Sequence, residues 1–228
     1  MSKPPYNPLD KLNLARSVAD ALLSLAPVPL ADTENIAGAG VYVIYYIGAF
    51  SPYATIAAQN RNNAFKQPIY AGKAIPKGAR KGGLGKNAAT GTALRDRLRQ
   101  HAQSIDQANN LHLNDFLFRS LVVDDIWIPL GESMMIEEFK PIWNRAIDGF
   151  GNKDPGRRRA TQYKSPWDVL HPGRDFAVKL ADSEITPEFL ERRVADYLAG
   201  LPLAKLPKAV IEQQAAELAE AEESADEA

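Results

Sequence analysis

The run from Val41 to Ile47 places the tightest limit on how this chain can fold. Every residue in it is β-branched or aromatic, a composition typical of a buried strand. A hairpin needs two strands of about five residues with a turn between them, and no turn residue separates Tyr42 from Tyr46. Both tyrosines therefore belong to one strand and point to one face, because side chains alternate with a period of two.

The partner of this strand has to come from further along the chain. The next apolar run that contains a tyrosine is IYAGK, which predicts a second short strand around Pro68 to Ala71. The polar stretch Gly48 to Gln67 between the two runs is expected to be a connection or an insertion. The literal YIG at Tyr46 is then a packing element, and the counterpart of Gly40-Val41-Tyr42 is Tyr70-Ala71-Gly72.

The remaining elements follow from apolar periodicity and from proline and glycine positions. A third strand is expected over Phe116 to Val123. Helices are expected over Leu9 to Leu25, from Thr92 onward, over LGESMMIEEFK before Pro141, and from about Thr186 to Leu198. This order predicts an α+β fold, an α/β layer in which helices flank a small mixed or antiparallel three-stranded sheet.

Composition divides the chain of 228 residues into four segments. We expect an N-terminal helical arm (1–37), a catalytic core (38–147), a C-terminal extension for DNA binding and dimerisation (148–208) and an acidic, disordered tail (209–228). The chain has no cysteine and three histidines, which excludes disulfides and thiolate zinc sites. It also lacks an apolar run of transmembrane length and a secretory signal pattern, so we expect a cytoplasmic protein with no membrane partner.

The net charge of −1 conceals a strong segregation of charge. Between Lys73 and Arg99 there are eight basic residues and one acidic residue, and from Lys140 to Lys164 seven basic and two acidic ones. The tail after Lys208 has seven acidic residues and no basic one. A polyanion-binding body with an acidic tail would show this pattern, although basic loops can also be merely solvated.

Several motifs follow the two paired strands in order: a helix with Arg97 and His101 at i and i+4, a helix beginning with Glu132, and FKPIWN, which contains Pro141 and Asn144. With GVY and YAG, they resemble the GIY-YIG nuclease superfamily over Gly40 to Asn144. The departures are Val41, Ala71 and the long insertion between the strands. The arginine–histidine spacing and the basic extension resemble the type II restriction endonucleases of this superfamily, in particular the SacII isoschizomers, which cut CCGCGG.

The resemblance implies roles for six residues, Tyr42, Tyr70, Arg97, His101, Glu132 and Asn144. Glu132 would be the metal ligand, since one carboxylate with waters and a DNA phosphate suits Mg²⁺, with Mn²⁺ as a substitute. Arg97 would bind the scissile phosphate through its guanidinium fork. Tyr42 would contact the attacking water, and Tyr70 would orient the water or the phosphate. Whether Tyr42 or His101 takes the proton stays open, because tyrosine has a pKa of about 10 and histidine one of about 6.5.

Each of these residues also has a plainer interpretation. Glu132 can be a favourable charge in the first turn of a helix, and Arg97 one of three surface arginines. The tyrosines can be packing residues, as we expect for Tyr45 and Tyr46. Asn144 can bond Glu132, bond the backbone or cap a helix.

The expected DNA contacts lie mainly in two basic segments. The glycine-rich loop after the second strand is not a nucleotide-binding P-loop, since position 80 is arginine and position 87 asparagine. A loop that binds DNA phosphates fits better, and arginines in the extension are candidates for reading guanine. The predicted contacts are Lys73, Lys77, Arg80, Lys81, Lys86, Arg157, Arg158, Arg159 and Arg174. The other two histidines, His112 and His171, are expected to be structural.

Together these features predict a Mg²⁺-dependent endonuclease that cuts double-stranded DNA at a specific palindrome. We expect it to act as a homodimer, because the chain holds one candidate site and a palindrome needs two symmetric cuts. Two alternatives stay open: a repair or structure-specific nuclease of the same superfamily, and a non-catalytic nucleic-acid-binding module.

Overall fold

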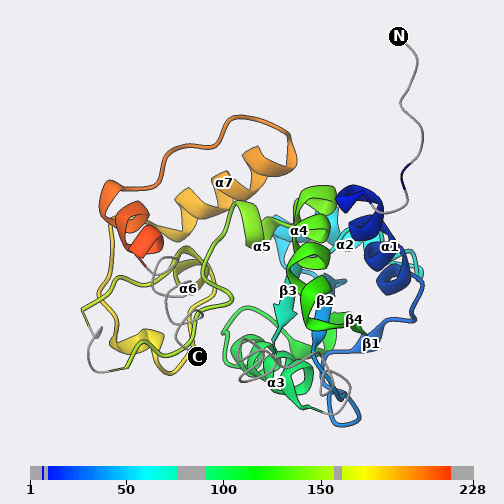
Figure 1. Ribbon diagram of the computed structural model, residues 1–228. Helices are drawn as coiled ribbons and strands as arrows, with labels where there is room; N and C mark the ends of the chain where they lie inside the picture. Colours follow the sequence, from blue (N-terminus) through cyan, green and yellow to red (C-terminus); the bar gives the residue numbers. More distant parts are fainter. Residues whose placement is uncertain (1–6, 8–9, 76–90, 157–160, 217–228) are drawn as a thin grey trace.

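A four-stranded antiparallel sheet in the order β1-β4-β2-β3 forms the centre of the molecule (Figure 1). The computed structural model describes residues 7, 10–75, 91–156 and 161–216. The strands are β1 (Val28–Pro29), β2 (Gly40–Tyr46), β3 (Tyr70–Ala74) and β4 (Phe116–Val122). The α+β class is confirmed. The three predicted strands are present within a few residues of their expected bounds, and β1 adds a fourth.

The central strand β2 explains the all-apolar run in the sequence, because both of its faces are covered. All seven of its residues are buried. Tyr42 and Tyr46 belong to one hydrophobic cluster, and Val41, Val43 and Tyr45 belong to another on the opposite face. The prediction that Tyr42 and Tyr46 share a face is therefore confirmed.

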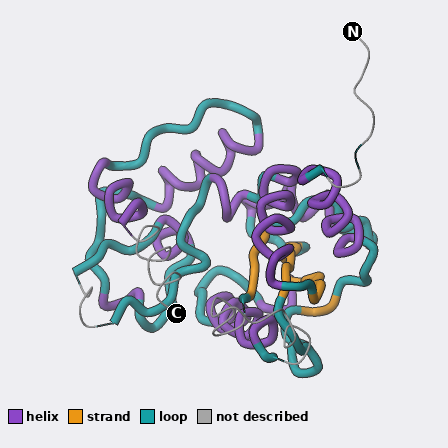
Figure 2. Tube along the Cα trace, viewed as in Figure 1, coloured by secondary structure: helices purple, strands orange, loops and turns teal. Residues whose placement is uncertain are grey.

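Helices cover both faces of the sheet (Figures 1 and 2). The helix α1 (Lys11–Leu23) packs on α4 (Ile128–Phe139), and both cover the face of Val41 and Val43. Gly131 permits this approach, since a Cβ there would lie 2.8 Å from Val18 Cγ1. Further helices among the described residues are α2 (Ala54–Asn60), α3 (Ala93–Asp106), α5 (Ile142–Arg145), α6 (Pro166–Leu170) and α7 (Pro187–Leu198), with 3-10 turns at Ser51–Tyr53, Leu113–Asp115, Asp125–Trp127 and Ala177–Lys179. Residues 208–216 are also helical.

The core on the Tyr42 face includes residues from the predicted C-terminal extension. Phe150, Trp167 and Leu190 belong to the same buried cluster as Tyr42. In Figure 1, α6 and α7 form a group to the left of the sheet, with α5 between them and it. The segment after residue 147 therefore packs against the sheet core, while its role in binding DNA or a second copy stays a prediction.

Two segments expected to be irregular contain helix. Of the two alternatives for the stretch from Gly48 to Gln67, a connection or an insertion, the structure selects the insertion, because the stretch contains α2 and contributes Ile56 to the core. Its polar residue Asn60 is buried and bonds the carbonyl oxygens of Tyr46 and Gln67, at 3.0 and 2.8 Å, which fastens the segment to the end of β2. In the tail, residues 208–216 are helical and Val210 is buried, so this part is ordered. Positions 217–228 lie outside the described residues.

Within the part of the chain that the structure describes, no helix combines the length and the apolar character needed to span a bilayer.

Candidate active site

A buried hydrogen bond between Tyr42 and His101 lies at the centre of the candidate site. Tyr42 comes from β2 and His101 from α3, and the phenol oxygen is 2.7 Å from Nε2 of the imidazole. Both side chains are at most 1% exposed. Burial raises the pKa of Tyr42 well above 10, an effect to which Tyr70 adds, and burial lowers the pKa of His101 well below 6.5. We therefore infer that a neutral phenol donates to an unprotonated Nε2 at neutral pH.

Gly72 on β3 allows this arrangement. Tyr42 pairs with Gly72 in the β2–β3 register, which confirms that GVY and YAG belong to neighbouring strands. A Cβ at position 72 would lie 2.4 Å from the Tyr42 hydroxyl oxygen and 2.6 Å from Cζ. Only glycine leaves room for the phenol here. In contrast, the hydroxyl of Tyr46 accepts a hydrogen bond from the Phe50 amide at 2.7 Å, so the literal YIG takes part in packing.

Tyr70 and Arg97 complete what we call the tyrosine site, which consists of Tyr42, Tyr70, Arg97 and His101. Burial raises the pKa of Tyr70, while the positive charge of Arg97 acts to lower the pKa of both tyrosines. The Tyr70 and His101 rings lie edge to face, with centroids 5.1 Å apart. The i and i+4 positions on α3 thus direct an arginine and a histidine to the same pair of tyrosines.

Glu132 approaches this site from α4 and forms an ion pair with Lys73 of β3. The Lys73 Nζ lies 2.8 Å from Oε2 of Glu132, and the two side chains are 38% and 19% exposed. Because α4 begins at Ile128, Glu132 is in its second turn, and the prediction of a helix that begins with Glu132 is wrong. Next to the dominant effect of burial, the Glu132 carboxylate also raises the pKa of Tyr42 and Tyr70. The charge of Glu132 is thus felt at both tyrosine hydroxyls.

Asn144 holds β3 in place through the backbone. Its side-chain oxygen accepts from the Ala71 amide at 2.8 Å, and its side-chain nitrogen donates to the Ala71 carbonyl at 2.9 Å. Of the three alternatives for this residue, the structure selects the backbone bond, since α5 is capped at Ala146. Asn144 therefore positions the strand that carries Tyr70 and Gly72.

Residues 34–198 match the family described as the Eco29kI GIY-YIG domain. The chain belongs to this family. The match includes every residue of the tyrosine site, together with Glu132 and Asn144, and extends through α6 and α7. This Eco29kI-type protein is accordingly a GIY-YIG nuclease of the restriction-endonuclease kind. No curated protein matches the chain.

The acidic side chain beside the tyrosine site limits how this Eco29kI-type site could hold a metal ion. Among the described residues, no group of three histidine or acidic side chains could enclose a cation. Glu132 alone, near the surface, suits a Mg²⁺ ion that keeps most of its water ligands and binds a substrate phosphate. The Glu132 carboxylate is now paired with Lys73, so a metal ion there would replace this ion pair.

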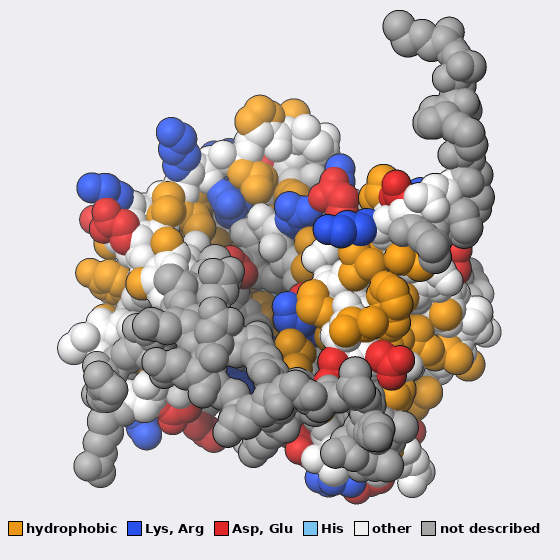
Figure 3. Space-filling view, in the orientation of Figure 1, with side chains coloured by type: hydrophobic (Ala, Val, Ile, Leu, Met, Phe, Trp, Pro, Cys, Tyr) orange, Lys and Arg blue, Asp and Glu red, His pale blue; other side chains and the backbone are white. Residues whose placement is uncertain are grey.

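The structure places only two of the nine predicted DNA contacts. Lys73 lies beside Glu132, at the site. Arg174 is 1% exposed and bonded to Asp168, so it cannot reach a base, and its assignment as a DNA contact is wrong. The other seven, Lys77, Arg80, Lys81, Lys86, Arg157, Arg158 and Arg159, lie outside the described residues. On the face shown in Figure 3, the described lysines and arginines are interspersed with acidic and apolar side chains.

Three residues that sequence reasoning did not assign to the site also contact it or support it. The Phe150 ring stacks on His101, with centroids 4.4 Å apart and an interplanar angle of 17°. The Gly151 carbonyl accepts from Arg97 Nη2 at 2.9 Å. Arg174 holds the backbone of the segment that contains Phe150 and Gly151. The segment GFGNKDPGRRR stands out in the sequence as glycine-rich and basic, but no spacing in it indicates contact with a helix about fifty residues earlier.

His171 forms a second buried tyrosine–histidine pair, and we expect it to make stability depend on pH. Its Nε2 is 2.7 Å from the Tyr53 hydroxyl and its Nδ1 is 2.9 Å from Asn110 Oδ1. Burial lowers the pKa of His171 to about 3. The unfolded chain binds a proton below about pH 6.5 and the folded chain does not, so this stabilisation is complete above pH 6.5 and is lost as pH falls.

For each such histidine the expected slope approaches about 1.4 kcal/mol of unfolding free energy per pH unit as the unfolded imidazole becomes fully protonated below pH 6.5. Urea unfolding between about pH 6.5 and 5.5 measures it, before most carboxylates titrate. In His171→Gln the slope should fall by about half a proton at pH 6.5 and by about 0.9 proton at pH 5.5. His112→Gln, which changes an exposed histidine, is the control for the substitution of histidine by glutamine. An unchanged slope in His171→Gln contradicts the assignment.

Proposed function

We propose that this nuclease is a Mg²⁺-dependent type II restriction endonuclease that cuts both strands of DNA at a specific palindrome, with CCGCGG as the candidate sequence. The observation that carries the proposal is the Tyr42–His101 hydrogen bond beside Arg97 and within the electrostatic reach of Glu132. Phosphodiester hydrolysis needs a proton acceptor for water, a cation for the phosphate and a metal-binding carboxylate, and these residues provide one of each.

The buried pair offers a path for the water proton. As the water oxygen bonds to phosphorus, its proton passes to the Tyr42 oxygen and the phenol proton passes to His101 Nε2. At rest the proton stays on Tyr42, because burial disfavours both the phenolate and the imidazolium. A bound phosphate brings negative charge that offsets the repulsion between Arg97 and a protonated His101. The sugar oxygen leaves as its bond to phosphorus breaks, and it takes a proton from solvent.

Arg97 and Glu132 have separate roles in this scheme. The guanidinium of Arg97 lies against the tyrosine hydroxyls, and it can bind a phosphate oxygen where the water attacks. Glu132 would hold the metal ion, and Lys73, now bonded to Glu132, would turn to a DNA phosphate. When bound, Mg²⁺ neutralises charge on the phosphoryl and leaving oxygens.

Replacing Glu132 tests the proposal. Plasmid DNA incubated with the wild type and Mg²⁺ should give discrete fragments, and both EDTA and Glu132→Gln should abolish them, because the metal loses its only charged protein ligand in the proposed site. Glu138→Gln is the matched control, since Glu138 lies on the same helix and is exposed, and it should cut like the wild type. Normal cutting by Glu132→Gln would show that the metal assignment is wrong.

The same experiment distinguishes the two alternative functions. Cleavage of branched or damaged DNA, with no discrete fragments from plain plasmid, indicates a structure-specific nuclease. Salt-dependent binding with no metal-dependent cutting indicates a binding module.

We propose that the working enzyme is a homodimer, because the described residues provide one tyrosine site per chain and a palindrome takes two symmetric cuts. Size-exclusion chromatography should show a species of twice the chain mass of 25.0 kDa. The rate of double-strand cleavage should fall more steeply than enzyme concentration on dilution, as the dimer dissociates. A monomer that cuts both strands in proportion to its concentration would exclude the dimer.

A further inference from the structure

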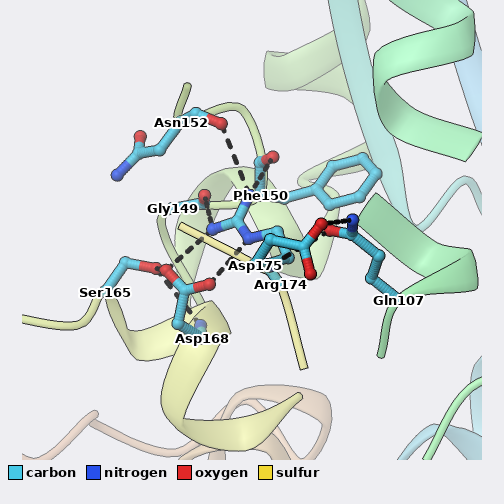
Figure 4. Close-up of polar contacts among 8 residues, drawn as sticks. All are labelled: Gln107, Gly149, Phe150, Asn152, Ser165, Asp168, Arg174 and Asp175. Carbon is cyan, nitrogen blue, oxygen red and sulfur yellow. Dashed lines mark hydrogen bonds and ion pairs between the residues drawn. The ribbon is translucent and has the colours of Figure 1, made fainter. Parts of the chain in front are cut away.

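Arg174 is a buried cation that bonds the backbone of one short segment at three points. Its Nη2 donates to the Gly149 carbonyl at 3.0 Å, and its Nη1 lies 3.2 Å from the Phe150 carbonyl and 3.4 Å from the Asn152 carbonyl (Figure 4). We call residues 149–152 the 149–152 segment. A guanidinium has five N–H donors spread over a rigid plane, so it can bond three carbonyls and a carboxylate at once, whereas a lysine has three donors on a single nitrogen.

Asp168 fixes the orientation of Arg174. Its carboxylate accepts from Arg174 Nε at 2.6 Å and from Nη2 at 2.7 Å, and it also accepts from the Ser165 hydroxyl at 2.6 Å (Figure 4). The guanidinium also lies 4.6 Å from the ring centroids of Trp167 and Phe176. Its charge is therefore fully paired, and its position is set from several sides.

The 149–152 segment contacts three members of the tyrosine site. Phe150 stacks on the imidazole of His101 and meets the Tyr70 ring edge to face, with centroids 5.0 Å apart. The Gly151 carbonyl accepts from Arg97. A Cβ at Gly151 would lie 3.1 Å from both Arg97 Nη2 and the Tyr70 hydroxyl, so the backbone packs directly against the two side chains.

We propose that Arg174 is a positioning residue for DNA cleavage, which acts by holding the 149–152 segment so that Phe150 fixes the ring of His101 and Gly151 fixes the guanidinium of Arg97. This inference rests on the proposed function of the tyrosine site. Arg174 itself touches no substrate. A displacement of about 1 Å in such a site can lower a rate by about 10²-fold, which is why a residue outside the site can control it.

The charge of Arg174 supports the same role. Burial lowers the pKa of His101 most, the positive charge of Arg97 lowers it further, and the positive charge of Arg174 adds to this effect. The other charged groups near that imidazole belong to the site already described. Arg174 thus favours the unprotonated Nε2 that accepts the Tyr42 proton.

The test compares Arg174→Lys with Arg193→Lys. Arg193, on α7, also bonds backbone carbonyls, those of Ala146 and Ala204, but has no bond to the 149–152 segment. For each folded variant, two quantities are measured with enzyme in excess over DNA. One is the maximal single-turnover cleavage rate, and the other is the enzyme concentration at which the rate is half of that maximum. Arg174→Lys should lose at least about tenfold in rate with little change in the half-maximal concentration, and Arg193→Lys should match the wild type.

Each other result has a defined meaning. Provided that the wild type cuts DNA, a wild-type cleavage rate in Arg174→Lys overturns the inference. A change in the half-maximal enzyme concentration alone, with no change in rate, also overturns it. Failure of the wild type to cut any DNA refutes the proposed function instead. If Arg174→Lys does not fold, Phe150→Leu decides: it keeps Arg174 and removes the stacking on His101. A tenfold loss of rate supports the inference, and an unchanged rate overturns it.

Discussion

Replacing Tyr42 with phenylalanine is expected to slow DNA cleavage by about 10²- to 10⁴-fold, the range typical for loss of a group that transfers protons. The substitution keeps the aromatic ring in the core and removes only the hydroxyl that bonds His101 Nε2 at 2.7 Å. The single-turnover cleavage rate on plasmid DNA measures the effect. Urea unfolding, run in parallel, shows whether the variant is folded under the assay conditions.

Tyr46→Phe is the matched control, because Tyr46 lies on the same strand and face as Tyr42. It removes a hydroxyl that accepts from the Phe50 amide and leaves that donor without its partner. We expect a loss of about 1–3 kcal/mol of unfolding free energy and an unchanged cleavage rate. If Tyr46→Phe loses as much rate as Tyr42→Phe, the literal YIG is the functional motif and our assignment is reversed.

Gly72→Ala should reduce cleavage by about 10²-fold or more, although position 72 has no side chain of its own. The added methyl group would lie 2.4 Å from the Tyr42 hydroxyl and 2.9 Å from Tyr70 Cε1, so both tyrosines have to move. The hydrogen bond to His101 cannot survive that shift. The readout is again the single-turnover rate, with the circular dichroism spectrum as a check on folding.

A double variant separates this mechanism from general damage to the fold. If the methyl group acts by displacing the Tyr42 hydroxyl, then Gly72→Ala adds little once that hydroxyl is gone. The cleavage rate of Gly72→Ala/Tyr42→Phe should therefore be close to that of Tyr42→Phe alone. Losses that multiply would mean that Gly72 acts independently of Tyr42, which would contradict the steric explanation.

The sequence predicts the strands well because their signal is local. The run from Val41 to Ile47 has no polar residue and no turn residue, so it can only be a covered strand and its partner has to lie elsewhere. The helices α3 and α7 begin as expected, with Thr92 and Thr186 at their N-caps. The buried position of Asn60 does not follow from the sequence, because composition does not distinguish a polar side chain that faces water from one that bonds two carbonyls in the interior.

The candidate site is predictable in part for the same reason. Arg97 and His101 are one helical turn apart, so their common direction follows from the sequence. The fate of Arg174 does not, because a buried arginine and a DNA-binding arginine look alike in a sequence. Arg174 is buried because Asp168 and three carbonyls converge on it, and that convergence exists only after folding. Contacts between distant segments, such as that of Phe150 with His101, are equally invisible to local patterns.

The bonds between Asn144 and Ala71 have a consequence for how two copies of this chain can associate. Strands at the edge of a sheet can recruit a strand from another molecule through unpaired backbone groups. On β3 the amide and the carbonyl of Ala71 are already taken by the Asn144 side chain. On the opposite edge, β1 is two residues long and one of them, Pro29, has no N–H to donate. We therefore expect protomers to join through side-chain surfaces, leaving each sheet four strands wide.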